Sequence, residues 1–348
     1  MEHKTESVAG TRAASVESNG IHSPGQGLPQ RTTTGGKFKR HCRKFWWLDF
    51  LIFAAIVLVI VLPIVYVGVP NEAQSEVDKT TLVVNAQDVT NPEPNSVGLA
   101  LNSTLTSHSR YHPNMDAFNV SLFLENTEPD IEPFGYIEIP KTHIDSKTSI
   151  DVNQTMQVAD MDQFIAYNKL VIGSEEFRVA MRGKPQMKLS GIPEFKVNFN
   201  KVVTMKGLNQ LSGSAITSAQ LINPPAADGA TMSGTVSIPN PSVLNLTIGT
   251  VAMNLSVDST PIGTSTIKSL VLSPGNNTAD MRAIVNTTLV LGLVSTNYTD
   301  GVLPIEAVGT SCVNDEGEAL VYYEEALADV VLRLDLNLTE ALTAASGS

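Results

Sequence analysis

The 348-residue sequence contains only two cysteines, six histidines and 17% charged residues. Two cysteines are too few for the disulfide framework of a small secreted domain or for a zinc-rich protein. Charge is also unevenly divided: residues 50–69 carry none, residues 1–49 carry eight Lys/Arg against four Asp/Glu, and residues 70–348 carry fifteen against thirty-one. The acidic larger part argues against nucleic acid as a partner, because binding to a phosphate backbone needs a basic face.

The sequence also lacks the motifs that place reactive groups at fixed spacing: G-x-S-x-G, the P-loop, H-E-x-x-H and paired C-x-x-C. We therefore predict no catalytic residue, no cofactor and no metal site. His108 and His112 have the spacing of helical metal ligands, but they precede a proline in a predicted loop and are interpreted as exposed histidines. Cys312 is predicted to be a buried thiol, with an interchain disulfide as the alternative.

One acidic cluster lies near the C-terminal end of the chain. It lacks the residue pattern of a Ca²⁺-binding loop, so we interpret it as a solvated surface. Its members are Glu316, Glu318, Glu324, Glu325 and Asp329.

Phe50–Val69 reads FLIFAAIVLVIVLPIVYVGV, twenty residues without a charge. A helix of that length extends about 30 Å, the thickness of the hydrocarbon core of a bilayer. The run starts too late for a cleaved signal peptide, so it predicts an uncleaved signal anchor. Because the basic residues precede the span, the N-terminus is expected in the cytosol and the 279 residues after the span in a lumen.

The cytosolic part, residues 1–49, is predicted to be a disordered basic tail because it has few bulky apolar residues to bury. Its juxtamembrane basic cluster is predicted to contact anionic lipids. The members of this cluster are Lys37, Lys39, Arg40, Arg43 and Lys44. Cys42, which lies within the cluster, is a candidate for palmitoylation, with an unmodified thiol as the alternative.

Nine N-x-[ST] sequons, the acceptors of N-glycosylation, lie beyond residue 69 and none precedes it, in agreement with a lumenal C-terminal part. The candidate residues are Asn102, Asn119, Asn153, Asn245, Asn254, Asn276, Asn286, Asn297 and Asn337.

Apolar residues alternate with polar ones in several runs after residue 80, which predicts strands with one buried face. The clearest runs are Phe118–Leu124, Val251–Val257 and Val330–Leu338. Pro and Gly turn signals separate such runs at short intervals, as expected of a β-sandwich. One helix is predicted after Asp160, which can cap it together with Gln163, and a second within residues 318–329.

Thr235–Val271 (TVSIPNPSVLNLTIGTVAMNLSVDSTPIGTSTIKSLV), with a predicted glycine-containing turn at Ile262-Gly263, resembles the late-embryogenesis-abundant group 2 domain. Phe118–Leu124, the segment MDQFIAYNKLVIG and Gly191–Gly207 are similar to the fungal domain-of-unknown-function relative of that family. Together the likenesses cover roughly residues 80–340. They imply immunoglobulin-like β-sandwiches and, by similarity to fungal members with the same layout, an address at the vacuolar membrane.

The predicted fold class is mainly β, with tandem immunoglobulin-like sandwiches after one transmembrane helix. A linker covers residues 70–79, the first sandwich with its helix residues 80–213, the second residues 214–340, and a disordered end residues 341–348. The predicted function is that of a non-catalytic adaptor or lipid- or protein-binding module at the vacuolar membrane. Its predicted partners are membrane lipids and an unidentified protein. A lumenal enzyme acting on glycans, or another hydrolase, is the alternative, and the endoplasmic reticulum and plasma membrane are the alternative addresses.

Overall fold

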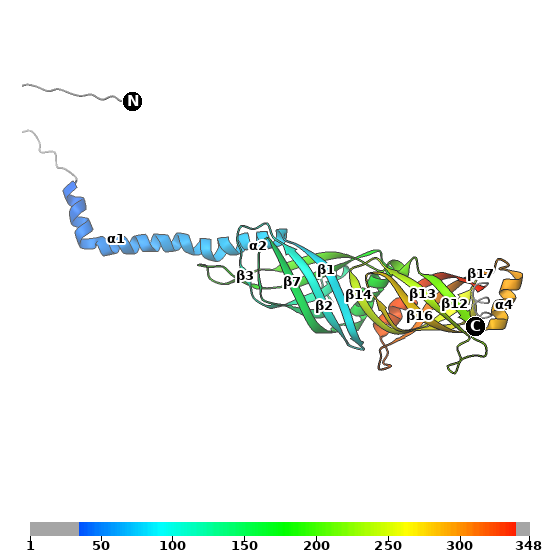
Figure 1. The fold of residues 1–348 in the computed structure, drawn as a ribbon. Helices are drawn as coiled ribbons and strands as arrows, with labels where there is room; N and C mark the ends of the chain where they lie inside the picture. The colour runs from blue at the N-terminus through cyan, green and yellow to red at the C-terminus, as the bar shows by residue number, and fades with distance from the viewer. Residues whose placement is uncertain (1–34, 339–348) are drawn as a thin grey trace, which may run out of the picture. The chain divides into compact units, whose positions relative to one another are not determined.

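A computed structural model describes the backbone of residues 35–338 and the side chains of residues 47–338. The chain divides into two compact units, one ending at Ile60 and the other beginning at Val61. The helical part of the first unit continues into the second along the backbone (Figure 1).

The N-terminal helical segment consists of α1 (Gly35–Pro63), a π-helical turn (Ile64–Gly68) and α2 (Val69–Lys79). Among the described residues, Trp47–Lys79 is the one helix long and apolar enough to cross a membrane. The prediction of disorder over residues 1–49 is wrong for residues 35–49, which are helical. Extending a helix that the apolar run has already nucleated costs little. Residues 1–34 lie outside the described part of the chain. The predicted linker is also helical, because it forms α2.

The rest of the described chain is mainly strand, as predicted, arranged in three sheets with a sandwich-like layout (Figure 1). The largest has ten strands: β12 (Ala215–Leu221), β13 (Met232–Asn240), β16 (Gly275–Val285), β15 (Thr260–Leu272), β14 (Leu244–Val257), β1 (Thr81–Glu93), β2 (Ser96–Thr106) and β7 (Lys147–Gln157) in that order, with β17 (Val302–Val313) beside β14 and β18 (Val331–Asn337) beside β17.

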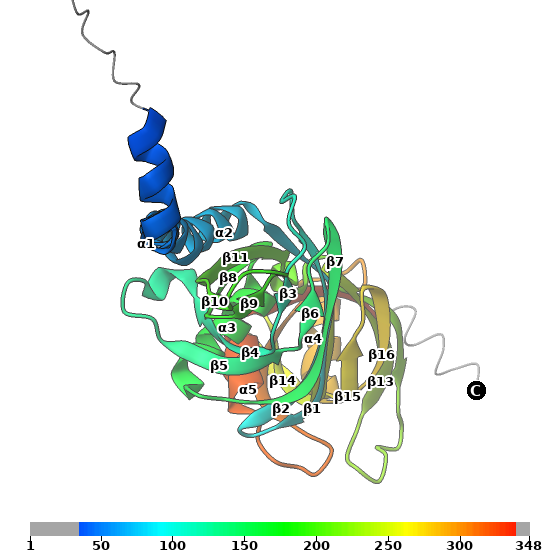
Figure 2. The same cartoon turned by 90° about the vertical axis from the view of Figure 1, so that its left-hand side faces the viewer.

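Two four-stranded sheets complete the β-structure. One, which faces the viewer in Figure 2, has the order β10 (Phe195–Lys196), β9 (Gln186–Lys188), β3 (Asn114–Met115) and β6 (Thr142–His143). The other has the order β11 (Phe199–Lys206), β8 (Glu176–Gly183), β4 (Phe118–Leu124) and β5 (Pro133–Ile139).

The period-two pattern correctly identified the strand faces. In β4, Phe118, Val120 and Leu122 are buried while Asn119 between them is exposed. In β18 the buried residues are Leu334 and Leu336. These alternating side chains form the core between the sheets because successive residues of a strand point to opposite faces.

The two predicted sandwiches share a sheet. Strand β1 runs parallel to β14, with Gln87 opposite Leu244. The predicted boundary at residue 213 falls in the connection between β11 and β12, while the residues on either side of it belong to one compact unit. The limits of two separate sandwiches therefore stay a prediction.

An aromatic cluster also joins segments distant in sequence. Helix α3 (Met161–Gly173) packs against α5 (Val321–Ala328), and each helix buries one face (Figure 2). The rings of Phe164 and Tyr322 are 4.8 Å apart between centroids, and those of Phe134 and Tyr167 are 4.7 Å apart. Such pairs of buried rings combine a large apolar area with favourable ring geometry.

Both predicted helices are confirmed, and besides α2 one further helix was missed. The carboxylate of Asp160 accepts a hydrogen bond from the Gln163 backbone N–H at 3.0 Å, as the capping pattern predicted for α3. Helix α5 lies within the predicted range of residues 318–329. The missed helix is α4 (Thr287–Thr296), capped by the Asn286 side chain. Its Thr and Val residues favour strands, so only the asparagine cap indicated it.

The predicted turn at Ile262-Gly263 is wrong. The hairpin turns instead at Asp258 and Ser259, whose φ angles of 47° and 63° suit a tight two-residue connection. Gly263 lies within β15, where an added Cβ would stand 2.1 Å from the carbonyl oxygen of Ile284. The glycine permits close approach of two strands rather than a turn.

Candidate functional site

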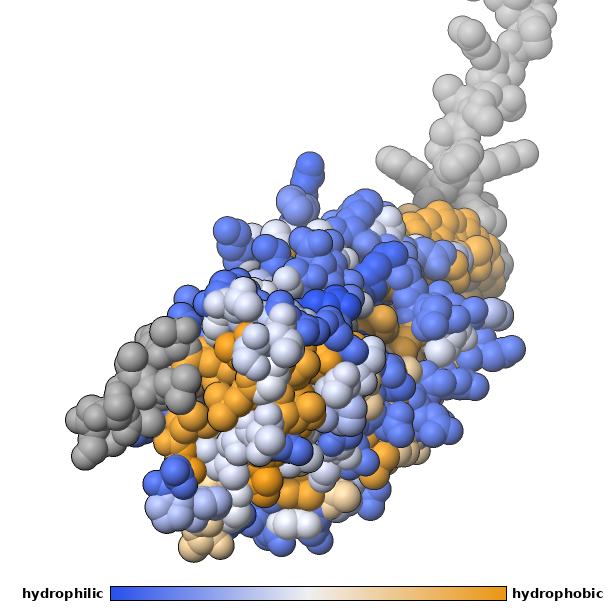
Figure 3. Space-filling model, turned by 90° about the vertical axis from the view of Figure 1, so that its right-hand side faces the viewer, coloured by the Kyte–Doolittle hydropathy of each residue, from blue (hydrophilic) through white to orange (hydrophobic). Residues whose placement is uncertain are grey.

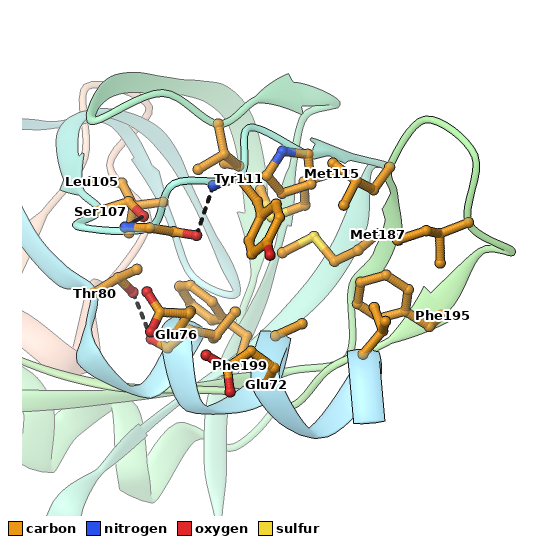
Figure 4. A pocket seen from close by; sticks show the side chains of 18 residues that line it. Glu72, Glu76, Thr80, Leu105, Ser107, Tyr111, Met115, Met187, Phe195 and Phe199 are labelled. Atoms are coloured by element: carbon orange, nitrogen blue, oxygen red, sulfur yellow. Dashed lines mark hydrogen bonds between the residues drawn. The ribbon is translucent and has the colours of Figure 1, made fainter. Parts of the chain in front are cut away.

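An apolar pocket of about 150 Å³ lies between α2 and the β-structure, within the second compact unit (Figure 4). Val69, the last residue of the uncharged run, is part of its lining. The opposite walls come from the end of β2, from β3, and from the β9–β11 region through Met187, Phe195 and Phe199. Every lining residue belongs to the second compact unit.

Backbone alternation decides which side chains of residues 105–115 reach the pocket. The odd-numbered residues line it: Leu105, Ser107, Ser109, Tyr111, Pro113 and Met115. The intervening His108, Arg110 and His112 are exposed and do not line it. The segment that contains His108 and His112 thus contributes hydroxyl, aromatic and apolar side chains to the cavity, while its basic side chains do not line it.

Helix α2 contributes one face, because residues three and four apart lie on the same side of a helix. This face carries Val69, Ala73 and Val77 together with two carboxylates, those of Glu72 and Glu76. Figure 4 shows both carboxylates on the helix side of the cavity and the ring of Tyr111 on the opposite side. The pocket thus has a mainly apolar lining, with the Glu72 and Glu76 carboxylates and the Tyr111 side chain as polar members.

Exposure falls from the edge of the pocket to its interior. Tyr111 is 59% exposed, whereas Met115 is 2% and Phe199 3% exposed. Apolar cavities of about 150 Å³ stay dry and accept a molecule the size of benzene. The interior is suited to a stretch of alkyl chain.

A set of hydrogen bonds holds α2 against the β-structure. Lys201 of β11, only 9% exposed, donates from Nζ to the carbonyl oxygens of Val77 at 2.7 Å and Thr80 at 2.6 Å. These carbonyls belong to the C-terminal end of the helix, where a positive charge is favourable. Burial lowers the pKa of the Lys201 ammonium, and the charge of Asp78 opposes that shift.

The nine candidate glycosylation residues lie outside the pocket, and none is buried. Seven are exposed, while Asn102 and Asn245 are half-buried. The Asn102 amide donates to Asp151 Oδ1 at 2.5 Å, within a network on the sheet surface. Their use as acceptors stays a prediction.

His112 lies near His143 rather than forming a helical pair with His108. His112 Nδ1 is 3.5 Å and His143 Nε2 is 3.7 Å from the same oxygen of Asp145. The described residues contain no group of three or more His, Cys, Asp or Glu side chains arranged to hold a metal ion.

Cys312 is fully buried, and its Sγ donates to the carbonyl oxygen of Ile248 at 3.3 Å. Burial, with a smaller contribution from Glu324, raises the pKa of the thiol to about 12. The prediction of a buried core thiol is confirmed, and an interchain disulfide would require the core to open.

The acidic cluster near the C-terminal end does not converge on one point. Glu325 and Asp329 instead pair with Lys169 of α3, at 3.5 and 2.9 Å. Glu318 accepts from the Asn314 amide at 3.1 Å. The juxtamembrane cluster and Cys42 lie in α1, but their side chains are outside the described part, so lipid contact and palmitoylation stay predictions.

Sequence reasoning missed the pocket because residues 70–79 were interpreted only as a linker. A signal was present: Val69, Ala73 and Val77 recur every four residues. The opposing walls, however, come from segments up to about 130 residues away, and no local pattern connects them.

Residues 132–255 match a family described as protein of unknown function (DUF3712). The matched range runs from the start of β5 into β14 and so crosses the predicted boundary at residue 213. No curated protein matches the chain.

Solved structures with some likeness include a bacterial adhesin from Mobiluncus mulieris, at 9% identity and a TM-score of 0.21 over 58% of this chain and 74% of that one. The periplasmic chaperone SfaE has 15% identity and a TM-score of 0.15 over 73% of this chain and 99% of that one. The CupB6 tip adhesin from Pseudomonas aeruginosa has 6% identity and a TM-score of 0.16 over 74% of this chain and 97% of that one. At these scores the likenesses support no conclusion about this chain.

Proposed function

We propose that the protein is a non-catalytic, membrane-anchored lipid-binding module, in which the pocket beside α2 takes an alkyl chain from the bilayer that holds the anchor. The observation that carries the proposal is the continuity of the pocket with the span, through Val69. The span leads directly into the α2 wall of the cavity along the sequence, so chain connectivity keeps the cavity near the bilayer.

The energetics favour exchange rather than permanent capture. An apolar cavity open to water is costly, and each methylene buried from water contributes about 0.8 kcal/mol. A lipid tail in a bilayer is already in an apolar environment, however, so its transfer into the pocket is close to neutral. The pocket would therefore fill readily and release its occupant readily.

Orientation and address form part of the same proposal. The β-rich part lies on the non-cytosolic side, supported by the basic flank of the span and by sequons confined to residues beyond 69. The vacuolar membrane is proposed as the address, supported by the resemblance to fungal late-embryogenesis-abundant group 2 relatives. Protease added to sealed vesicles should remove only the N-terminal tail, whereas digestion of the β-rich part would reverse the orientation.

The lipid proposal is tested by photocrosslinking on the full chain reconstituted in vesicles. The probe is a phospholipid with a diazirine near the end of one acyl chain, and crosslinked peptides are mapped by mass spectrometry. We expect adducts on the buried pocket residues Leu105, Met115 and Met187 in addition to the span.

Ala73→Phe, which fills the pocket from α2, should remove the pocket adducts and leave those in the span. Asn71→Phe, an exposed position of the same helix outside the lining, is the matched control and should leave both. Adducts confined to the span in the unsubstituted chain would contradict the proposed function.

A further inference from the structure

The pocket edge carries a charge pattern that its apolar interior does not require. Glu72 and Glu76, four residues apart on α2, face the cavity together. Glu76 has a cation partner, since its Oε1 lies 2.8 Å from Lys79 Nζ. Glu72 forms no hydrogen bond or ion pair with any residue that the structure describes. Two carboxylates and one ammonium leave this side of the pocket negative.

The opposite side of the pocket presents an aromatic ring. Tyr111 is 59% exposed, and its ring lies across the cavity from the carboxylates (Figure 4). Within the described part of the chain its hydroxyl has no hydrogen-bond partner. A cation placed over the face of such a ring is attracted by the ring quadrupole.

The basic side chains of the neighbouring loops and strands do not line the cavity. His108 and Arg110 are exposed and do not line the cavity, whereas the alternate residues Ser109 and Tyr111 do. Lys141, in the connection between β5 and β6, and Lys188 of β9 lie 3.6 and 3.1 Å from carboxylate oxygens of Asp116. The pocket edge is therefore unfavourable for an anionic head group and favourable for a cationic one.

We propose that the occupant of this pocket is a lipid with a positively charged nitrogen at its head, whose alkyl chain fills the apolar interior while the ammonium meets the Glu72 and Glu76 carboxylates and the Tyr111 ring. The inference rests on the proposed lipid-binding function and supplies the selectivity that an apolar interior cannot, since tails of different lipids are chemically alike.

The test uses three probes with the same sixteen-carbon diazirine chain and different heads: a primary amine, an alcohol and a carboxylate. Each is added to vesicles holding the full chain, and adducts on Met115 and Met187 are quantified after illumination. We expect the amine to label the pocket roughly fivefold more than the alcohol, because an exposed ion pair and a cation–π contact are each modest. The carboxylate should label it least.

Glu72→Gln combined with Glu76→Gln should bring the amine-to-alcohol ratio to about one without reducing labelling by the alcohol. Tyr111→Leu keeps apolar bulk and should lower the ratio in part. Asp78→Asn, on the same helix outside the pocket lining, is the control and should leave the ratio unchanged.

Equal labelling by the three heads in the unsubstituted chain would overturn the head-group inference while leaving lipid binding intact. Absence of pocket adducts with every head would instead overturn the proposed function.

Discussion

Gln74 of α2 and Asn198, which precedes β11, exchange two hydrogen bonds across 124 residues of sequence. The Gln74 amide donates to the Asn198 carbonyl oxygen at 2.9 Å, and the Asn198 backbone N–H donates to Gln74 Oε1 at 2.7 Å. Together with Lys201 at the helix end, this pair fixes α2 against the β-structure. The wall of the pocket is thereby held in place by polar contacts as well as by its apolar face.

Lys201→Met should destabilise the protein. The carbonyl oxygens of Val77 and Thr80 would lose a charged donor in a buried setting, which costs about 1–3 kcal/mol of the free energy of unfolding. Lys206→Met, on the same strand but exposed, should change it little. Thermal unfolding of the full chain in detergent measures the difference. Equal melting temperatures for the two variants would show that the helix-end contact contributes nothing.

Cys312 should resist alkylation in the native protein. The thiol is fully buried and its pKa is raised to about 12, so at pH 8 it is neither accessible nor ionised. Iodoacetamide followed by peptide mapping should label it only after denaturation, and the denatured chain serves as the positive control. Rapid labelling of native protein would contradict the burial of this side chain.

Because of the same thiol, the free energy of unfolding should depend on pH in the alkaline range. Its pKa is higher in the folded chain than the ordinary thiol value of 9.0, so the unfolded chain loses the proton first. The stabilisation is complete below about pH 9 and is lost as the pH rises toward about 12. The stability advantage of the unsubstituted chain over Cys312→Ala should accordingly shrink between pH 8 and pH 11, and a constant advantage would argue against this shift.

Ser265→Ala should stabilise the protein. The Ser265 hydroxyl is buried without a hydrogen-bond partner in the described structure, in an apolar region between the strands. Removing it relieves an uncompensated desolvation of about 1 kcal/mol or more. Ser242→Ala is the contrasting variant, because that buried hydroxyl donates to Asn240 Oδ1 at 2.6 Å and its loss should destabilise. Urea unfolding measures both variants. If the two substitutions shifted the unfolding midpoint in the same direction, the proposed difference between the two hydroxyls would be refuted.

Asp160→Ala should weaken α3. The cap hydrogen bond to the Gln163 N–H would be lost, at a cost of about 1 kcal/mol. Asp162→Ala removes an exposed carboxylate of the first turn but no cap, and should cost less. Hydrogen exchange of the α3 amides should rise selectively in the first variant. Unchanged exchange in that variant would show that packing alone holds the helix start.

Local patterns in the sequence determined the elements whose cause is local. Twenty uncharged residues specify a helix that can span a membrane, alternation in Phe118–Leu124 specifies a strand with one buried face, and Asp160 with Gln163 specifies where α3 begins. The tertiary structure decided what depends on distant segments. It paired β1 with β14 in parallel, packed α5 against α3, and closed a pocket between α2 and strands up to about 130 residues away. The physical reason is that a sequence pattern shows which face of a helix or strand is apolar, but not which other element packs against that face. A cavity forms only where two packed faces leave a gap, so its position depends on the tertiary structure.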